Sequence, residues 1–169
     1  MILQPGDVFG TSNPQGLGKP ICLAESLKSQ DGKAEYGHTG ILTSVHADTL
    51  EALWSIKSQN LFEVYKGHKV IIARWTGMNT EAYQQGYEAI KPQIGRWYPV
   101  WRLALHAVGL AKWLHFLNTP VCSELTAMFL NKAGAKCLFG DNYWGVTPDN
   151  LVDEWIQSKY FDVTFEGIL

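Results

Sequence analysis

The segment Thr119-Pro120-Val121-Cys122-Ser123-Glu124 places a thiol where a helix is expected to begin. Thr119 can cap the helix and Pro120 suits its first position, which puts Cys122 at the third position of the first turn. The unpaired N–H groups and the positive dipole end of that turn favour an anion, and hence the nucleophilic thiolate form of a cysteine. Cys122 is therefore the leading candidate for a nucleophile.

Two other cysteines compete with Cys122. Cys22 also lies at the start of a short apolar helix expected over 21–29, so the same argument applies to it. Cys22 is only sixteen residues from His38, however, and unless the intervening loop doubles back the two side chains are not expected to meet. Cys137 has no activating neighbour beyond the adjacent lysine. We expect Cys22 and Cys137 to be buried and unreactive.

A nucleophilic thiol needs an imidazole to take its proton and a polar group to hold the second imidazole nitrogen. The candidate bases are His38, His46, His68, His106 and His115. His38 stands out because Gly37 and Gly40 flank it near the start of a predicted strand, where glycine lets another backbone or a substrate approach closely. The other four lie in turns or on an apolar helix and are interpreted as surface or boundary residues.

The elements that must position these residues follow a simple order. Strands are predicted near 7–9, 37–45, 50–56, 61–65, 70–75 and 161–165, and helices over 21–29, 80–94, 101–117, 122–133 and from Thr147-Pro148 onward. The middle strands read as an antiparallel meander. Because strands gather early in the chain and helices late, the pattern indicates an α+β fold and not a parallel βαβ sheet.

Composition limits the classes of protein to consider. A chain of 169 residues is expected to form one domain spanning 1–169, and 46% hydrophobic residues are typical of a globular protein. A net charge of −2 and no run of Lys or Arg argue against a nucleic-acid partner. Three cysteines exclude a complete disulfide framework and leave at least one free thiol, which suits either a reducing compartment or a thiol kept for chemistry.

Neither a signal peptide nor a membrane span is expected. The first seven residues lack a basic and an apolar region, and the apolar stretch 100–117 is short and interrupted by charged residues and histidines. We therefore predict a soluble protein, cytoplasmic or carried in a larger particle. The segment Trp97 to Leu117 is long for a plain connection; it could be a lid or groove wall, but a core helix is favoured because amphipathic helices usually pack inward.

Five short motifs occur in order along the chain. They are Gly6-Asp7-Val8, Tyr36-Gly37-His38-Thr39-Gly40-Ile41, Leu50-Glu51-Ala52, Val121-Cys122-Ser123-Glu124-Leu125 and Thr147-Pro148-Asp149-Asn150-Leu151. From Gly6 to about Trp155, the chain resembles the permuted papain-like cysteine hydrolases, in the YiiX/YaeF-like branch of the NlpC superfamily. In that branch the papain-like order is rotated, so that the histidine precedes the cysteine.

The resemblance implies a role for three residues: Cys122 as nucleophile, His38 as general base and Glu51 as the orienting third member. It implies an α+β, circularly permuted papain-like (NlpC-type) fold, in which a small antiparallel barrel-like sheet packs against the cysteine-bearing helix. It also implies hydrolysis or transfer at an amide or ester, commonly in peptidoglycan peptides or related acyl substrates, with no metal or organic cofactor.

The strand spacing supports Glu51 less than the resemblance does. With a two-residue loop at Ala47-Asp48, strand pairing places Glu51 opposite Ser44, on the face of His38 but about six residues away along it. Only a strong twist, a bulge or a rearranged turn would then bring the two together. Glu63 or a backbone carbonyl are the alternatives for the third member.

Three functions fit these observations. The leading hypothesis is a cysteine amidase or peptidase, whose oxyanion would be held by the N–H of Cys122 and one neighbouring group. An acyltransferase would use the same cysteine and histidine but pass the acyl group to an amine or lipid. A structural or binding module of a larger assembly would keep the fold without catalysis.

Overall fold

A computed structural model describes residues 2–12, 35–97, 120–135 and 143–169 of the chain. Six strands form one antiparallel sheet in the order β4-β3-β2-β1-β5-β6. Their bounds are β1 Val8–Thr11, β2 His38–Leu42, β3 Asp48–Ala52, β4 Ile56–Asn60, β5 Lys69–Trp75 and β6 Phe161–Ile168. The described helices are α2 Leu61–Val64, α3 Thr80–Ile90, the 3-10 helix η1 Lys91–Gln93, α5 Cys122–Ala133 and α6 Pro148–Gln157. The predicted α+β class and antiparallel pairing are confirmed.

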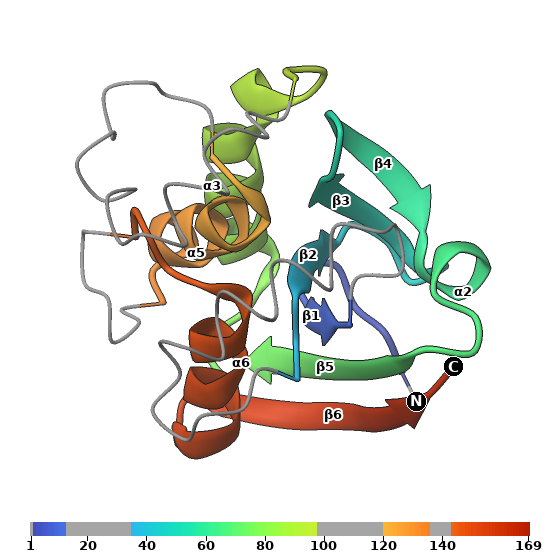
Figure 1. Ribbon diagram of the computed structural model, residues 1–169. Helices are drawn as coiled ribbons and strands as arrows, with labels where there is room; N and C mark the ends of the chain where they lie inside the picture. Colours follow the sequence, from blue (N-terminus) through green and yellow to red (C-terminus); the bar gives the residue numbers. More distant parts are fainter. Residues whose placement is uncertain (1, 13–34, 98–119, 136–142) are drawn as a thin grey trace.

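The sheet separates two apolar clusters because successive side chains point to opposite faces. On one face, residues such as Val8, Ile41 and Ile71 pack with α5 and α6, and α3 packs against α5 (Figure 1). On the other face, Phe9 and Leu42 pack with other buried side chains, among them Leu3, Leu61, Tyr65, Val70 and Ile72. We call these the helix face and the α2 face.

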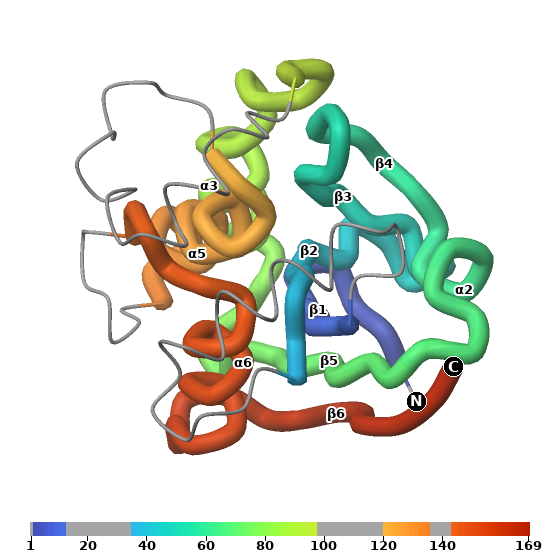
Figure 2. Tube along the Cα trace, viewed as in Figure 1, coloured from blue at the N-terminus to red at the C-terminus, as the bar shows by residue number. Residues whose placement is uncertain are grey.

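Both ends of the described chain lie on the α2 face. Leu3 belongs to that apolar cluster and Leu169 packs against it. The backbone of Leu169 exchanges hydrogen bonds with Gly67 and His68, just before β5. Figure 2 shows the last strand running along β5 to this corner of the sheet.

Local sequence explains the helix ends that position the site. The α5 helix ends where Gly134 adopts φ 101°, a left-handed conformation that glycine accepts without strain. The α6 helix begins with Thr147, whose side chain accepts a hydrogen bond from the N–H of Asn150, followed by Pro148 in the first turn. Both were predicted from the sequence and are confirmed.

Two of the predicted strands are wrong in detail. Residues 61–65 form α2 and its C-cap, because the Asn60 side chain caps Phe62 and because Leu61 and Tyr65, one helical turn apart, are both fully buried. The strand predicted over 50–56 is two strands, since β3 ends at Ala52 and β4 begins at Ile56.

Several predictions lie outside the described residues. These are the helices over 21–29 and 101–117, and the side chains Cys22, Cys137, His106 and His115. Within the described ranges, no helix is both long and apolar enough to cross a membrane.

Candidate active site

Cys122 lies at the first residue of α5. The N-cap is Val121, whose N–H donates to the Glu124 carboxylate at 3.1 Å, so the helix starts later than the predicted Thr119 cap. Cys122 therefore occupies the first helical position and not the third. The correction follows from Glu124, which satisfies the N-cap amide from three residues ahead.

The start of α5 is fixed to a second segment of the chain. Glu124 also accepts a hydrogen bond from the N–H of Gly145 at 2.9 Å, and the hydroxyl of Ser123 donates to the carbonyl of Val146 at 2.6 Å. Ser123 and Glu124 are fully buried, and the Cys122 side chain is also buried. The thiol is thus held on a rigid element instead of a loop.

His38 is the first residue of β2, opposite Thr11 of β1. Its ring packs against Tyr65 and Phe9, with centroids 6.1 Å and 6.2 Å away. The Cys122 thiol interacts with the His38 ring, whose Nε2 is hydrogen-bonded to Glu51. Nδ1 is therefore the nitrogen available to the thiol.

Glu51 meets His38 directly. The distance between His38 Nε2 and Glu51 Oε2 is 2.8 Å, and both side chains are buried. The strand register explains this: β2 and β3 pair Ile41 with Leu50, which sets Glu51 opposite Gly40, two residues from His38 on the same face. The predicted pairing of Glu51 with Ser44 is wrong.

Gly40 makes the contact between Glu51 and His38 possible. A Cβ atom at residue 40 would lie 2.9 Å from Cγ of Glu51 and 2.6 Å from Cε1 of Phe9. The Glu51 side chain therefore crosses the space that any other residue at position 40 would fill.

Two hydroxyl groups complete the surroundings of the Glu51 carboxylate. Tyr65 donates to Oε2 and Thr49 donates to Oε1. Sequence reasoning missed both. The alternation of strand faces indicates Thr49, which lies two residues before Glu51, whereas Tyr65 is the C-cap of α2 in a segment that the sequence predicts as a strand.

The electrostatics of the three residues are coupled. Burial by itself would lower the pKa of His38, but the side chains of Cys122 and Glu51 outweigh it and raise that pKa to about 10. Burial likewise opposes ionisation of Glu51, yet the hydrogen bonds from His38, Thr49 and Tyr65 hold its pKa below the usual value. Burial and the Glu51 charge raise the pKa of Tyr65, which keeps the phenol a donor.

The alternatives considered for these positions lie elsewhere. Glu63 is exposed on α2, whereas His38 is buried. His46 is exposed and His68 is partly exposed, both in turns. The structure thus brings together Cys122, His38 and Glu51.

Of the comparisons with known proteins, only the comparison with solved structures gives a match. No family model matches the sequence, and no curated protein matches it. Among solved structures the chain is similar to a crystal structure from Escherichia coli O157:H7 described as metalloprotein yiiX, DUF1105, with a TM-score of 0.57 and 18% identity over 100% of both chains. The fold is similar to that of YiiX. YiiX also gives its name to the branch that the five motifs resemble.

The description of YiiX as a metalloprotein raises the question of a metal in this chain. Within residues 2–12, 35–97, 120–135 and 143–169, no three side chains of His, Cys, Asp or Glu are grouped so as to hold a metal ion. The His38 imidazole, a common metal ligand, is hydrogen-bonded to Glu51 through Nε2 and interacts with Cys122. The described residues around Cys122 therefore do not fit a metal.

Proposed function

We propose that this chain is a cysteine hydrolase that cleaves an amide or ester bond through Cys122, His38 and Glu51. One observation carries the proposal: a thiol at a helix start interacts with an imidazole whose Nε2 lies 2.8 Å from a buried carboxylate. This is the arrangement that nucleophilic catalysis by cysteine needs.

The chemistry follows from the roles of the three groups. His38 takes the proton of the Cys122 thiol, and the thiolate attacks the carbonyl carbon of the substrate. The negative charge that develops on the carbonyl oxygen is stabilised by the N–H of Cys122 at the positive end of α5. His38 then protonates the leaving amine or alcohol, which leaves an acyl group on the thiol as a thioester.

The second half of the cycle regenerates the thiol. His38 removes a proton from water, the resulting hydroxide attacks the thioester carbon, and the carboxylic acid leaves as the sulfur regains its proton. Glu51 does not exchange protons in this scheme; it orients the ring and stabilises the imidazolium. If an amine or a lipid hydroxyl replaces water, the same intermediate gives acyl transfer.

The order of the groups along the chain suits a permuted papain-like fold, since His38 on the sheet precedes Cys122 on the helix. The resemblance to this group favours peptides of peptidoglycan, or related acyl compounds, as substrates. A nucleic acid is not proposed as a partner, because the net charge is −2 and no basic run is present.

The test is to trap the acyl-enzyme. The chain is incubated with peptidoglycan fragments and, separately, with p-nitrophenyl acetate, and the adduct is located by mass spectrometry. We expect acylation of Cys122, loss of the adduct in Cys122→Ala, and no change in the matched control Cys22→Ala. Adding an amine acceptor distinguishes transfer from hydrolysis.

Two outcomes would contradict the proposal. Acylation that persists in Cys122→Ala and disappears in Cys22→Ala would assign the nucleophile to the other thiol. A wild-type chain that is folded but forms no adduct with either reagent would instead favour a structural or binding module.

A further inference from the structure

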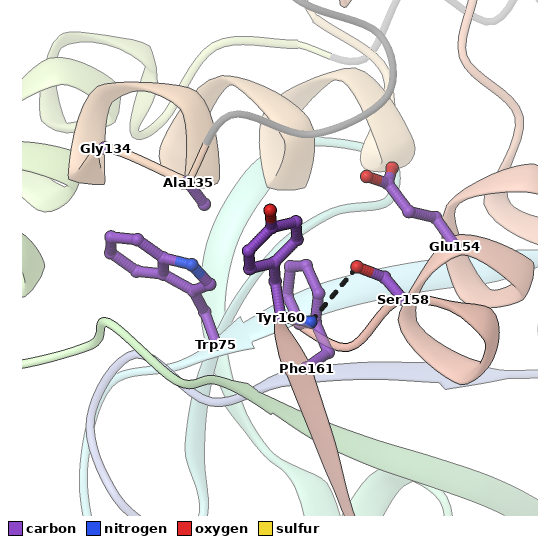
Figure 3. Close-up of a pocket in the computed structure, with 7 residues that line it drawn as sticks. All are labelled: Trp75, Gly134, Ala135, Glu154, Ser158, Tyr160 and Phe161. Carbon is purple, nitrogen blue, oxygen red and sulfur yellow. Dashed lines mark hydrogen bonds between the residues drawn. The ribbon is translucent and has the colours of Figure 1, made fainter.

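A second candidate site lies at the end of α5 remote from Cys122. It is a pocket of about 290 Å³ lined by Trp75, Ala135, Glu154, Ser158, Tyr160 and Phe161, with Gly134 at its edge (Figure 3). At 1.5 Å per residue, the 12 residues of α5 separate the two ends by about 18 Å. The pocket is therefore distinct from the candidate active site.

Aromatic rings form one side of the pocket. Trp75 ends β5, Phe161 begins β6, and the two residues pair across the sheet, with Tyr160 directly before Phe161. In Figure 3 the rings of Trp75 and Tyr160 project from the strand ends toward Gly134 and Ala135. A hydrogen bond of 3.2 Å from the N–H of Tyr160 to Ser158 Oγ fixes the connection between α6 and these rings. Aromatic faces of this kind attract organic cations.

A carboxyl group lines the other side of the pocket. The Glu154 side chain lines the pocket from α6 and is 4% exposed. Gly134 and Ala135 are the residues that close the C-terminal end of α5, through hydrogen bonds to Asn131 and Leu130. The C-terminal end of a helix carries the negative pole of its dipole and favours a cation. The carboxylate and the helix end thus add to the preference of the rings.

The chain itself supplies a cation beside one of these rings. The ammonium of Lys159 lies 5.3 Å from the centroid of Tyr160, within the range of a cation–π contact. Tyr160 is 55% exposed, so this lysine is close to the outer edge of the pocket. Lys159 would therefore compete with a ligand cation for Tyr160.

We propose that this pocket binds an organic ammonium group, either the quaternary ammonium of a choline-type compound or the primary ammonium of a lysine side chain. The rings of Trp75 and Tyr160 contact the alkyl groups, and Glu154 with the end of α5 neutralises the charge. The site recognises a ligand and takes no part in the chemistry of Cys122.

Binding is measured by calorimetry and by tryptophan fluorescence with three probes. Choline and Nα-acetyl-lysine methylamide carry the two kinds of ammonium, and 3,3-dimethylbutan-1-ol is the uncharged isostere of choline. We expect at least one ammonium probe to bind about tenfold or more tightly than the neutral alcohol, because charge and not shape provides the recognition. Comparison of the two ammonium probes distinguishes the sources.

Three variants test the assignment. Glu154→Gln should weaken ammonium binding about tenfold, and Tyr160→Leu, at an exposed position, about fivefold. Lys159→Gln should strengthen it about twofold to threefold, because it removes the competing cation. Cys122→Ser should leave the affinity unchanged, which separates this site from the proposed hydrolase.

The proposal is overturned if the neutral alcohol binds as tightly as choline, or if neither ammonium probe binds the wild-type chain. It is also overturned if both Glu154→Gln and Tyr160→Leu keep the wild-type affinity. Thermal melts of each variant identify loss of the fold, and the exposed Tyr160 provides the decisive variant if Glu154→Gln does not fold.

Discussion

Gly40→Ala tests whether the room at residue 40 is what lets Glu51 reach His38. The new Cβ would lie 2.9 Å from Cγ of Glu51 and 2.6 Å from Cε1 of Phe9. Since carbon atoms pack at about 3.5–4.0 Å, the Glu51 side chain must retreat by about 0.6 Å or more. Phe9 is fully buried and has little space to move instead. The bond of 2.8 Å between Glu51 and His38 would then lengthen beyond hydrogen-bonding range.

The expected loss can be estimated from this displacement. A misplacement of about 1 Å in a catalytic group costs about 100-fold in rate, or about 2.7 kcal/mol of transition-state stabilisation. Crowding of the core should also lower the free energy of unfolding by about 1–3 kcal/mol. The pKa of His38 should fall, because Glu51 is one of the groups that raise it.

The assay is the acylation of Cys122 by p-nitrophenyl acetate, followed as a burst of p-nitrophenol. The background carries Cys22→Ser and Cys137→Ser, so that Cys122 is the only one of the three thiols present. The matched control is Gly10→Ala, whose Cβ would lie 2.5 Å from Cγ2 of Val152 and does not approach Glu51. Its stability should drop similarly while its acylation rate stays near the wild-type value. Equal rates for the two glycine variants would refute the reasoning.

Three further predictions concern stability. Tyr65→Phe removes a donor to Glu51 and should lower the free energy of unfolding in urea by about 1–3 kcal/mol, whereas no change would mean that the hydroxyl does not support the carboxylate. Because the pKa of His38 is raised from 6.5 to about 10, its charged form contributes stability that is complete below pH 6.5 and is lost as pH rises toward 10. Because the pKa of Glu51 is lowered from 4.5, its charged form contributes stability that is present above pH 4.5 and is lost as pH falls further. The melting temperature should therefore decrease both as pH rises above 6.5 and as pH falls below 4.5. A melting temperature that stays constant as pH rises toward 10 would contradict the assignment to His38. The fully buried carboxylate of Asp7 contacts Arg74, with 2.7 Å between Arg74 Nε and Asp7 Oδ1. Asp7→Asn weakens this contact and should lower the free energy of unfolding in urea by about 2–4 kcal/mol.

The C-terminal end of α5 and the start of α6 could be predicted from the sequence. Gly134 ends α5 and Thr147-Pro148 begins α6 because each residue type has a local physical preference that needs no knowledge of the rest of the chain. The run of β-branched residues Val70, Ile71 and Ile72 likewise indicated β5. Cys122 and His38 could be selected from such local patterns together with the family resemblance.

The position of Glu51 could not be found in the same way. The backbone N–H of Thr43 donates to the carbonyl of Asp48, so the turn consists of residues 44–47 and not of Ala47-Asp48. The centre of the turn lies two residues earlier than expected. In an antiparallel pair this moves the partner of Glu51 by four residues, from Ser44 to Gly40. Ala47 adopts φ 66°, a left-handed conformation for which alanine gives no sequence signal.

The pairing of β5 with β6 has a consequence for how the chain is made. The 85 residues from 76 to 160 separate the two strands, and on the ribosome this interval takes about 4–17 s at about 5–20 residues per second. Until β6 emerges, β5 presents a row of unpaired N–H and C=O groups on that edge, next to the apolar side chains of Val70, Ile71 and Ile72. Nascent chains stalled before residue 161 should therefore be the forms most prone to aggregation and most dependent on chaperones.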